Sequence, residues 1–384
     1  MTRLLFSMLI TSFLIQVNAQ TTLTKTIEVD GVTRTYNLYI PATYDGTLSV
    51  PLVFNFHGYT SDMVSQAGYG DFRPISDTAN FLLIHPQGLD IGGGLGWNNF
   101  LNYSPTNYDY AFISQLIDTL EVNYKVDEKR IYSTGMSNGG FMSYDLACFM
   151  SNRFAAVASV TGGMVQSHIN ACNPERRVPI MQIHGTNDLT VLYNGGGSSG
   201  SVSVDNLVAH WVNLNECDQS PTIESVPNIN MSDFSTVEHQ VYSGGINGHE
   251  IELYKVIDGG HTWPGSSYDI PGLVTNKDID ASKEIWRFFR NYSLEDQQNA
   301  VKQKKVESLI VAPNPVQDEI QMNNATLKAH EVLIIDTKGK VILKQKLTSK
   351  INVIKCTSIS PGSYYYQLID KVGGVLKIGK IQKN

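Results

Sequence analysis

The feature that most constrains this chain is the pentapeptide Gly135-Met136-Ser137-Asn138-Gly139. A strand-like run, Arg130 to Thr134, precedes it, and a helix-like run, Gly140 to Ala147, follows it. A serine in so tight a strand–turn–helix connection needs small neighbours, and the turn exposes its hydroxyl at the edge of a sheet. The alternative is an ordinary glycine-rich turn before a helix, so the motif needs partners elsewhere in the chain. Ser137 is our candidate nucleophile.

A serine nucleophile needs a base to take its proton and a carboxylate to orient that base. After such an elbow the expected chain order is serine, acid, histidine. Asp188 follows the apolar strand-like run Val178 to Ile183, and His261 lies on the glycine-rich loop Asp258-Gly259-Gly260-His261. Open α/β sheets place their sites beyond the carboxyl ends of strands. We therefore predict a triad of Ser137, Asp188 and His261.

Simpler roles compete with this assignment. An Asn-Asp pair such as Asn187-Asp188 is common in turns, and Asp258 is a rival acid better placed to shape the histidine loop. Four other histidines are rival bases, two of which precede a glycine in what looks like a turn: His57, His85, His184 and His249.

A tetrahedral intermediate requires two N–H donors for its oxyanion. One is expected from the residue after the nucleophile, Asn138. The other should come from the loop His57-Gly58-Tyr59-Thr60, where the Tyr59 N–H is the best candidate. The Tyr59 ring and Trp263 are expected to flank the acyl pocket. Trp97 is a third candidate wall, with a core role equally open.

Short apolar strands alternate with helical patterns through most of the chain, which predicts an α/β fold with a mostly parallel sheet flanked by helices. The expected strands are 24–29, 33–40, 51–56, 81–84, 130–134, 154–160, 178–183 and 251–257, and the expected helices 108–124, 140–147, 204–214 and 282–289.

The alternation ends at a polar, charged segment that we interpret as a linker. Beyond it, short strands separated by turn residues predict a small all-β module. The expected organisation is a signal peptide at 1–19, a catalytic domain at 20–294, a linker at 295–307 and a β-sandwich at 308–384.

The first residues have a basic start, a short apolar run and small residues before Gln20, as in a cleaved signal peptide. We expect no transmembrane segment in the mature chain. The net charge of −7, without a basic block, argues against nucleic acid as a partner.

Export makes disulfides possible, and the chain has four cysteines. The most plausible bridge joins Cys148 and Cys172, and at least one cysteine should stay unpaired. The cysteines lack metal-ligand spacing, so we expect no structural metal, and the triad chemistry requires no cofactor.

Four separated motifs resemble the secreted α/β-hydrolase family of polyhydroxybutyrate depolymerases and feruloyl or acetylxylan esterases. They are His57-Gly58-Tyr59, the elbow with Gly140, Ile183 to Asp188, and Gly259 to Gly265. The resemblance spans roughly residues 25–292. It implies Ser137 as nucleophile, Asp188 as acid, His261 as base, and Tyr59 and Asn138 as oxyanion donors.

Two details of the resemblance concern the substrate. The stretch Val191 to Gly196, with Tyr193, resembles the family's substrate-side loop. Family members usually have a cysteine after the His-Gly pair or cysteine-rich loops near the Trp97 position, where this chain has Tyr59 and no cysteine. With Tyr59 at that position, the chain also resembles polyester hydrolases that act on aromatic polyesters.

The tail resembles the C-terminal sorting domain of the type IX secretion system of Bacteroidetes, through Ala312 to Val316, Ile335 to Lys340 and Ser360 to Tyr365. This implies contact with that secretion machinery and a secreted or cell-surface protein. The alternative is a small carbohydrate-binding or adhesive β-module.

We therefore expect a monomeric, secreted carboxylic-ester hydrolase that acts on plant-wall esters (feruloyl or acetyl-xylan) or on polyesters. The alternatives are a peptidase of the same fold and a non-catalytic surface-binding protein on a decayed hydrolase.

Overall fold

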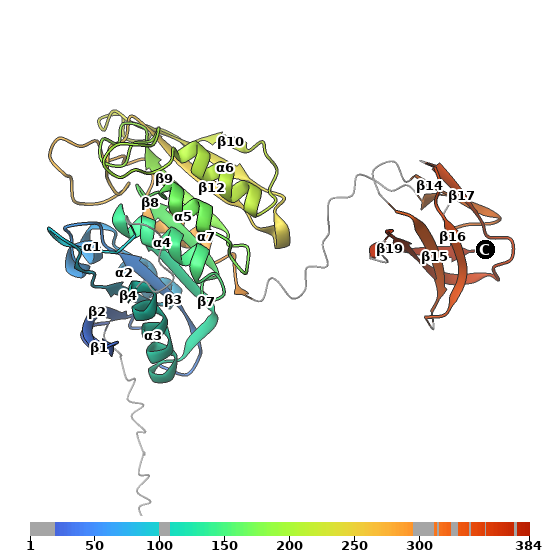
Figure 1. The fold of residues 1–384 in the computed structure, drawn as a ribbon, viewed down its shortest axis with the longest axis horizontal. Helices are drawn as coiled ribbons and strands as arrows, with labels where there is room; N and C mark the ends of the chain where they lie inside the picture. Colours follow the sequence, from blue (N-terminus) through green and yellow to red (C-terminus); the bar gives the residue numbers. More distant parts are fainter. Residues whose placement is uncertain are drawn as a thin grey trace, which may run out of the picture. The chain divides into compact units, whose positions relative to one another are not determined.

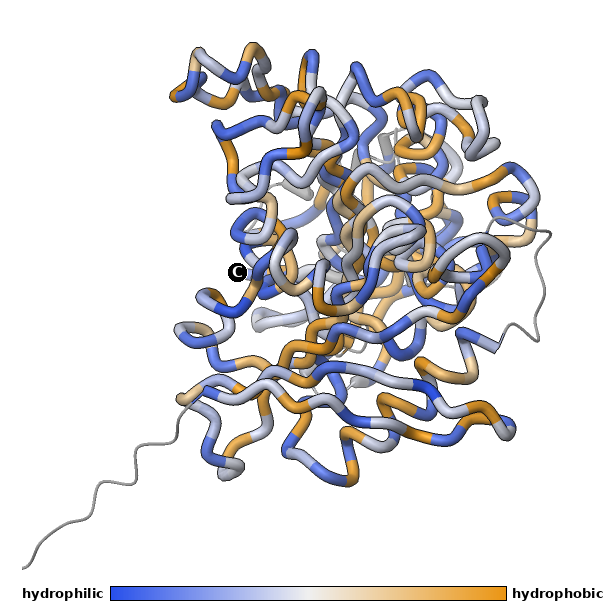
Figure 2. The backbone as a smooth tube through the Cα atoms, turned by 90° about the vertical axis from the view of Figure 1, so that its left-hand side faces the viewer, coloured by the Kyte–Doolittle hydropathy of each residue, from blue (hydrophilic) through white to orange (hydrophobic). Residues whose placement is uncertain are grey.

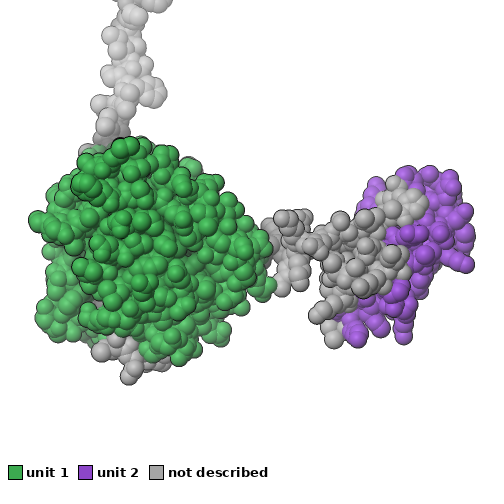
Figure 3. All heavy atoms as spheres, turned by 90° about the horizontal axis from the view of Figure 1, so that it is seen from above, with its two compact units in different colours: residues 1–300 green, residues 301–384 purple. Residues whose placement is uncertain are grey.

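The computed structural model describes residues 20–99, 108–294, 311–312, 315–323, 329–337, 339–349, 351–371 and 375–384. Its chain divides into two compact units, Met1–Ala300 and Val301–Asn384 (Figures 1 and 3). The predicted signal peptide, 1–19, and linker, 295–307, lie outside the described residues, so the predicted domain boundaries stay predictions.

The first unit is built on a 10-stranded sheet in the order β1-β2-β4-β3-β7-β8-β9-β12-β11-β10 (Figure 1). The central strands β4, β3, β7, β8, β9 and β12 run parallel, and the outer strands pair antiparallel. The strands are β1 Thr21–Val29, β2 Val32–Ile40, β3 Val50–Phe56, β4 Leu82–Pro86, β7 Val126–Gly135, β8 Ala156–Val160, β9 Ile180–Gly185, β10 Thr222–Ser225, β11 Thr236–Tyr242 and β12 Ile251–Ile257.

Helices cover both faces of this sheet (Figure 1). They are α1 Met63–Tyr69, α2 Arg73–Ala79, α3 Tyr108–Asn123, α4 Asn138–Phe149, α5 Gln166–Ala171, α6 Val204–Leu214 and α7 Ala281–Phe289, with the short helix η1 Ile246–Gly248. A separate hairpin is formed by β5 Leu89–Asp90 and β6 Leu95–Gly96. The predicted mostly parallel sheet flanked by helices is confirmed. The antiparallel edge strands β10 and β11 were not among the predicted strands.

Two hydrophobic cores lie on the two faces, because successive side chains of a strand point to opposite sides. On β3, Leu52 and Phe54 belong to the core that includes Leu116 of α3, whereas Val53 belongs to the core that includes Ile285 of α7. In Figure 2, hydrophobic stretches cross the middle of the picture.

The second unit consists of antiparallel strands in two sheets, β13-β14-β17 and β16-β15-β18-β19. One core takes side chains from both sheets, among them Ile320, Ile354, Ile334 and Leu368, as in a β-sandwich. The strands are β13 Val311–Ala312, β14 Glu319–Asn323, β15 Glu331–Asp336, β16 Val341–Lys346, β17 Ile351–Lys355, β18 Gly362–Ile369 and β19 Val375–Lys383. The all-β tail is confirmed.

Within the described part of the chain, no helix has both the length and the apolar character needed to cross a membrane.

Candidate active site

Ser137 lies in the turn between β7 and α4, with backbone angles φ 54° and ψ −121°. A positive φ is rare for a residue other than glycine, and such strain often marks a functional position. The Ser137 N–H donates to Val160 O of β8 at 2.8 Å. The flanking glycines are sterically required, because a Cβ at Gly139 would overlap the backbone oxygen of Phe56. The turn is therefore held in the form that the sequence motif predicts.

Asp188 and His261 meet although their loops follow different strands, β9 and β12. The Asp188 Oδ2 lies 2.7 Å from the His261 Nδ1. The other carboxylate oxygen, Oδ1, accepts the backbone N–H groups of Thr190 at 2.8 Å and Val191 at 2.9 Å. Asp188 is buried, whereas the His261 side chain is 12% exposed. The carboxylate can therefore fix the imidazole while the outer part of the ring stays accessible.

The three predicted triad residues lie at one edge of the sheet. Ser137 follows β7, Asp188 follows β9 and His261 follows β12, and these strands are parallel. The carboxyl ends of parallel strands lie on the same side of a sheet, where open α/β folds place their sites. Gly185 brings the last two loops together, since a Cβ there would overlap Gly259 O.

His184, one of the rival bases in the sequence, is a neighbour of Asp188. Its Nε2 lies 2.8 Å from Val191 O and 3.4 Å from the Asp188 Oδ2. Burial lowers the pKa of His184, which favours the neutral ring with a proton to share between these acceptors. His184 thus supports the loop that carries Asp188.

The rival bases are all deeply buried. His57 bonds Gly58 O through Nδ1 and accepts the Gly88 N–H at Nε2. Burial lowers the pKa values of His85 and His249 to about 3. The rival acid, Asp258, is exposed, and its N–H donates to the Thr186 Oγ1 at 2.9 Å. Asp258 therefore shapes the loop, the role for which the sequence made it better placed than for that of the acid.

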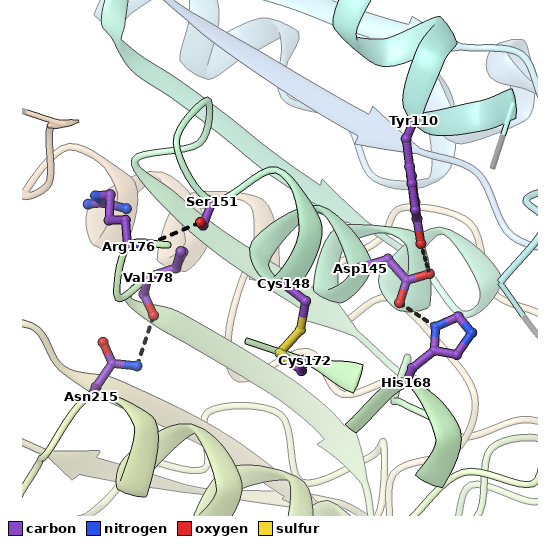
Figure 4. The surroundings of a disulfide bond; sticks show 9 residues. All are labelled: Tyr110, Asp145, Cys148, Ser151, His168, Cys172, Arg176, Val178 and Asn215. Carbon is purple, nitrogen blue, oxygen red and sulfur yellow. Dashed lines mark hydrogen bonds and ion pairs between the residues drawn. A yellow bond between two sulfur atoms is a disulfide. The ribbon is translucent and has the colours of Figure 1, made fainter. Parts of the chain in front are cut away.

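Two further histidine–carboxylate pairs lie away from this edge. His239 of β11 pairs with Glu252 of β12 at 2.8 Å. His168 of α5 pairs with Asp145 of α4 at 2.7 Å, and both are buried (Figure 4). Neither pair accompanies a serine in an elbow.

The predicted oxyanion donors lie beside the nucleophile. A Cβ at Gly58 would be 3.4 Å from the Ser137 Cβ, so the loop that carries Tyr59 reaches the elbow. Among the described residues, neither the Tyr59 N–H nor the Asn138 N–H has a backbone acceptor. Within these described ranges, both groups are therefore available to donate to a substrate.

The four predicted substrate-binding side chains differ in their exposure to solvent, and their role in binding stays a prediction. Trp97, Trp263 and Tyr193 are at most 6% exposed, whereas Tyr59 is 39% exposed. The three buried rings belong to the hydrophobic cores, and the polar tip of each has a hydrogen-bond partner. The Trp97 Nε1–H donates to His57 O, the Trp263 Nε1–H to the Ser282 Oγ, and the Tyr193 hydroxyl to the exposed Asp205.

Cys148 and Cys172 form a disulfide between α4 and the end of α5 (Figure 4). Cys217 and Cys356 are buried thiols. Within the described ranges, no group of histidine, cysteine and carboxylate side chains could hold a metal ion.

The sheet order and the elbow at its edge give the first unit an α/β-hydrolase fold. Residues 105–215 match the phospholipase/carboxylesterase family, and residues 310–381 match the secretion system C-terminal sorting domain. The predicted type IX sorting domain, and with it secretion or cell-surface localisation, is confirmed.

Curated relatives carry esterase names. The chain is 33% identical to a probable feruloyl esterase C of Aspergillus niger, over 42% of this chain and 58% of that protein. It is 27% identical to feruloyl esterase C of Emericella nidulans, over 64% of this chain and 87% of that protein. It spans only 22% to 66% of the length of the first four relatives.

The fold resembles that of an acetyl xylan esterase from Aspergillus awamori. The TM-score is 0.51 at 14% identity, and the match covers 70% of this chain and 99% of that one. At this identity the likeness concerns the fold. The predicted resemblance to feruloyl and acetylxylan esterases is confirmed.

Proposed function

We propose that the chain is an exported serine carboxylic-ester hydrolase that works through an acyl-enzyme. The observation that carries this proposal is the Asp188–His261 hydrogen bond of 2.7 Å at the sheet edge where Ser137 is held at positive φ. The esterase names of the relatives support it.

In the proposed mechanism, the Ser137 Oγ attacks the ester carbonyl while the His261 Nε2 takes its proton. The backbone N–H groups of Tyr59 and Asn138 stabilise the oxyanion. His261 then protonates the leaving alcohol, and a water activated by the same ring hydrolyses the acyl-enzyme. Asp188 keeps the Nδ1 protonated, so the Nε2 is free to act as the base.

The proposed substrates are feruloyl or acetyl esters of plant-wall polysaccharide, because the curated relatives are named for them. A polyester is a second candidate. It is favoured by the exposed ring of Tyr59 in the loop beside the nucleophile.

The full exported chain should be assayed on methyl ferulate, acetylated xylan, polyhydroxybutyrate film, an aromatic polyester film and a peptide amide, with Ser137→Ala as control. Ester turnover that disappears in Ser137→Ala supports the proposal. Preference for ferulate or xylan supports the plant-wall substrates, and release from film supports a polyester. Turnover that survives Ser137→Ala, or an inactive wild type, contradicts the proposal.

A further inference from the structure

The segment from Gly88 to Asn99 contacts both loops that carry the proposed oxyanion donors. It comprises the hairpin of β5 and β6 and the turn that follows. Its hydrogen bonds reach the elbow at Asn138 and the loop after β3 at His57, Tyr59 and Thr60. These two loops supply the two N–H groups separately, so their spacing depends on whatever joins them.

On the elbow side, the Asn138 side chain is fully buried and its hydrogen-bonding groups are occupied. Its Oδ1 accepts the Trp97 N–H at 2.7 Å, and its Nδ2 donates to Trp97 O at 3.1 Å and to the Asn99 Oδ1 at 2.6 Å. The Asn99 Nδ2 donates back to Asn138 O at 2.9 Å. The side chain thus pairs with Trp97 as a neighbouring strand would, which fixes the residue that follows the nucleophile.

On the other side, the same Trp97 holds the Tyr59 loop. Its indole Nε1–H donates to His57 O at 2.9 Å, and its ring packs edge-on against Phe56 at 5.0 Å between centroids. The Thr60 N–H donates to Leu95 O at 2.8 Å, and the Tyr59 hydroxyl donates to Gly92 O at 2.8 Å.

Gly96 lies between the two donor residues. A Cβ at this position would be 2.9 Å from the Asn138 Oδ1 and 3.1 Å from the Tyr59 Cδ2. The segment therefore fills the space between the two loops and leaves no room for either to shift toward the other.

We propose that Trp97 and Asn99 are positioning residues of the oxyanion hole, which set the distance between the Tyr59 and Asn138 N–H groups. This inference rests on the proposed function. Donors that are fixed before the reaction stabilise the developing charge without reorganising, and a displacement of about 1 Å can cost roughly 100-fold in rate. A buried, fully satisfied hydrogen-bond network provides that rigidity.

The alternative is that Trp97 and Asn99 only fill and satisfy the core, and the chain offers matched controls for that role. Trp211 of α6 is also fully buried in the same core, but its Nε1–H has no acceptor among the described residues. Asn215 is fully buried and donates to the backbone oxygens of Val178 and Trp211.

The test compares Trp97→Phe with Trp211→Phe, and Asn99→Ala with Asn215→Ala, in the full chain. For each protein the measurements are kcat and KM on the best ester substrate, the inhibition constant of a trifluoromethyl ketone analogue, and the thermal midpoint. The Ser137 Oγ adds to the ketone carbonyl, and the adduct carries an oxyanion. The affinity of the ketone therefore measures how well the two N–H donors stabilise that charge.

We expect Trp97→Phe and Asn99→Ala to lower kcat about 10- to 100-fold with little change in KM. The inhibition constant of the ketone should rise in proportion to the loss of kcat. The control variants should keep kcat and ketone affinity within about threefold, whatever their thermal midpoints. Equal effects in variants and controls, or a loss confined to KM, overturn the inference while leaving the ester hydrolase intact. A wild type that hydrolyses no ester overturns both.

Discussion

The Asp188 carboxylate divides its two oxygens between two tasks. Oδ2 lies 2.7 Å from the His261 Nδ1, and Oδ1 holds the N–H groups of Thr190 and Val191. The acid is therefore fixed by its own loop before it orients the histidine. The candidate base depends on a carboxylate that has little freedom to turn away.

Asp188→Asn should lower kcat by roughly 10³- to 10⁴-fold, because the amide no longer holds the proton on the Nδ1. Its carbonyl oxygen can still accept the two loop N–H groups, so the thermal midpoint should change little. Steady-state kinetics and thermal unfolding check this. Asp258→Asn is the control, and a larger loss of kcat there would reassign the acid.

Gly185→Ala should impair activity and stability together. The added methyl would overlap Gly259 O, which pushes the end of β9 away from the loop of His261. We expect kcat to fall about 100-fold and unfolding to become easier by about 1–3 kcal/mol. Steady-state kinetics measure the loss of kcat, and denaturant unfolding measures the loss of stability.

Gly68→Ala is the matched control for that variant, since its new Cβ would be 3.5 Å from the Tyr268 ring, an ordinary contact. Normal activity in Gly185→Ala would mean that the two loops do not depend on this approach.

The catalytic unit should lose stability as the pH falls. Burial lowers the pKa values of several histidines, to about 3 for His85 and His249. The unfolded chain binds their protons near pH 6.5 and the folded chain does not, so this stability is present above about pH 6.5 and is lost toward pH 3. Thermal midpoints between pH 8 and pH 4 measure the slope.

His85→Leu should flatten that slope, because the His85 Nε2 has no partner in the described structure and an apolar side chain cannot take up a proton. Parallel slopes for the wild type and His85→Leu would remove His85 from the explanation.

Reduction of the Cys148–Cys172 disulfide should destabilise the first unit (Figure 4). The bridge closes a loop with a sequence separation of 24, for which the chain-entropy relation gives about 3.4 kcal/mol. Denaturant unfolding with and without reductant measures the loss. The double variant Cys148→Ser/Cys172→Ser should have the lower stability already and show no response to reductant.

The sequence was enough to place the parallel core of the sheet, since its strands are short apolar runs bounded by turn residues. The edge strand β10 was missed because its four residues, Thr222–Ser225, are all exposed and show no apolar alternation. Strand β14, Glu319–Asn323, was also missed in the tail, although its alternation of polar residues with the buried Ile320 and Met322 is the pattern of a half-buried strand.

The site was predictable where a motif implies a backbone geometry, as at Ser137. It was not predictable where exposure decides the role, because Trp97 and Trp263 look the same in a loop sequence whether they line a pocket or fill a core. The sequence also drew attention to the Asn138 N–H but not to its side chain, whose partners Trp97 and Asn99 are distant in the chain.

The positive φ of Ser137 has a consequence for the stability of the chain. A side chain held in that conformation costs about 1–3 kcal/mol, and glycine would relieve the cost. Ser137→Gly should therefore give a more stable protein that cannot form an acyl-enzyme. The strain at this position and the proposed role of its hydroxyl are therefore linked, because the one substitution that relieves the strain also removes the hydroxyl.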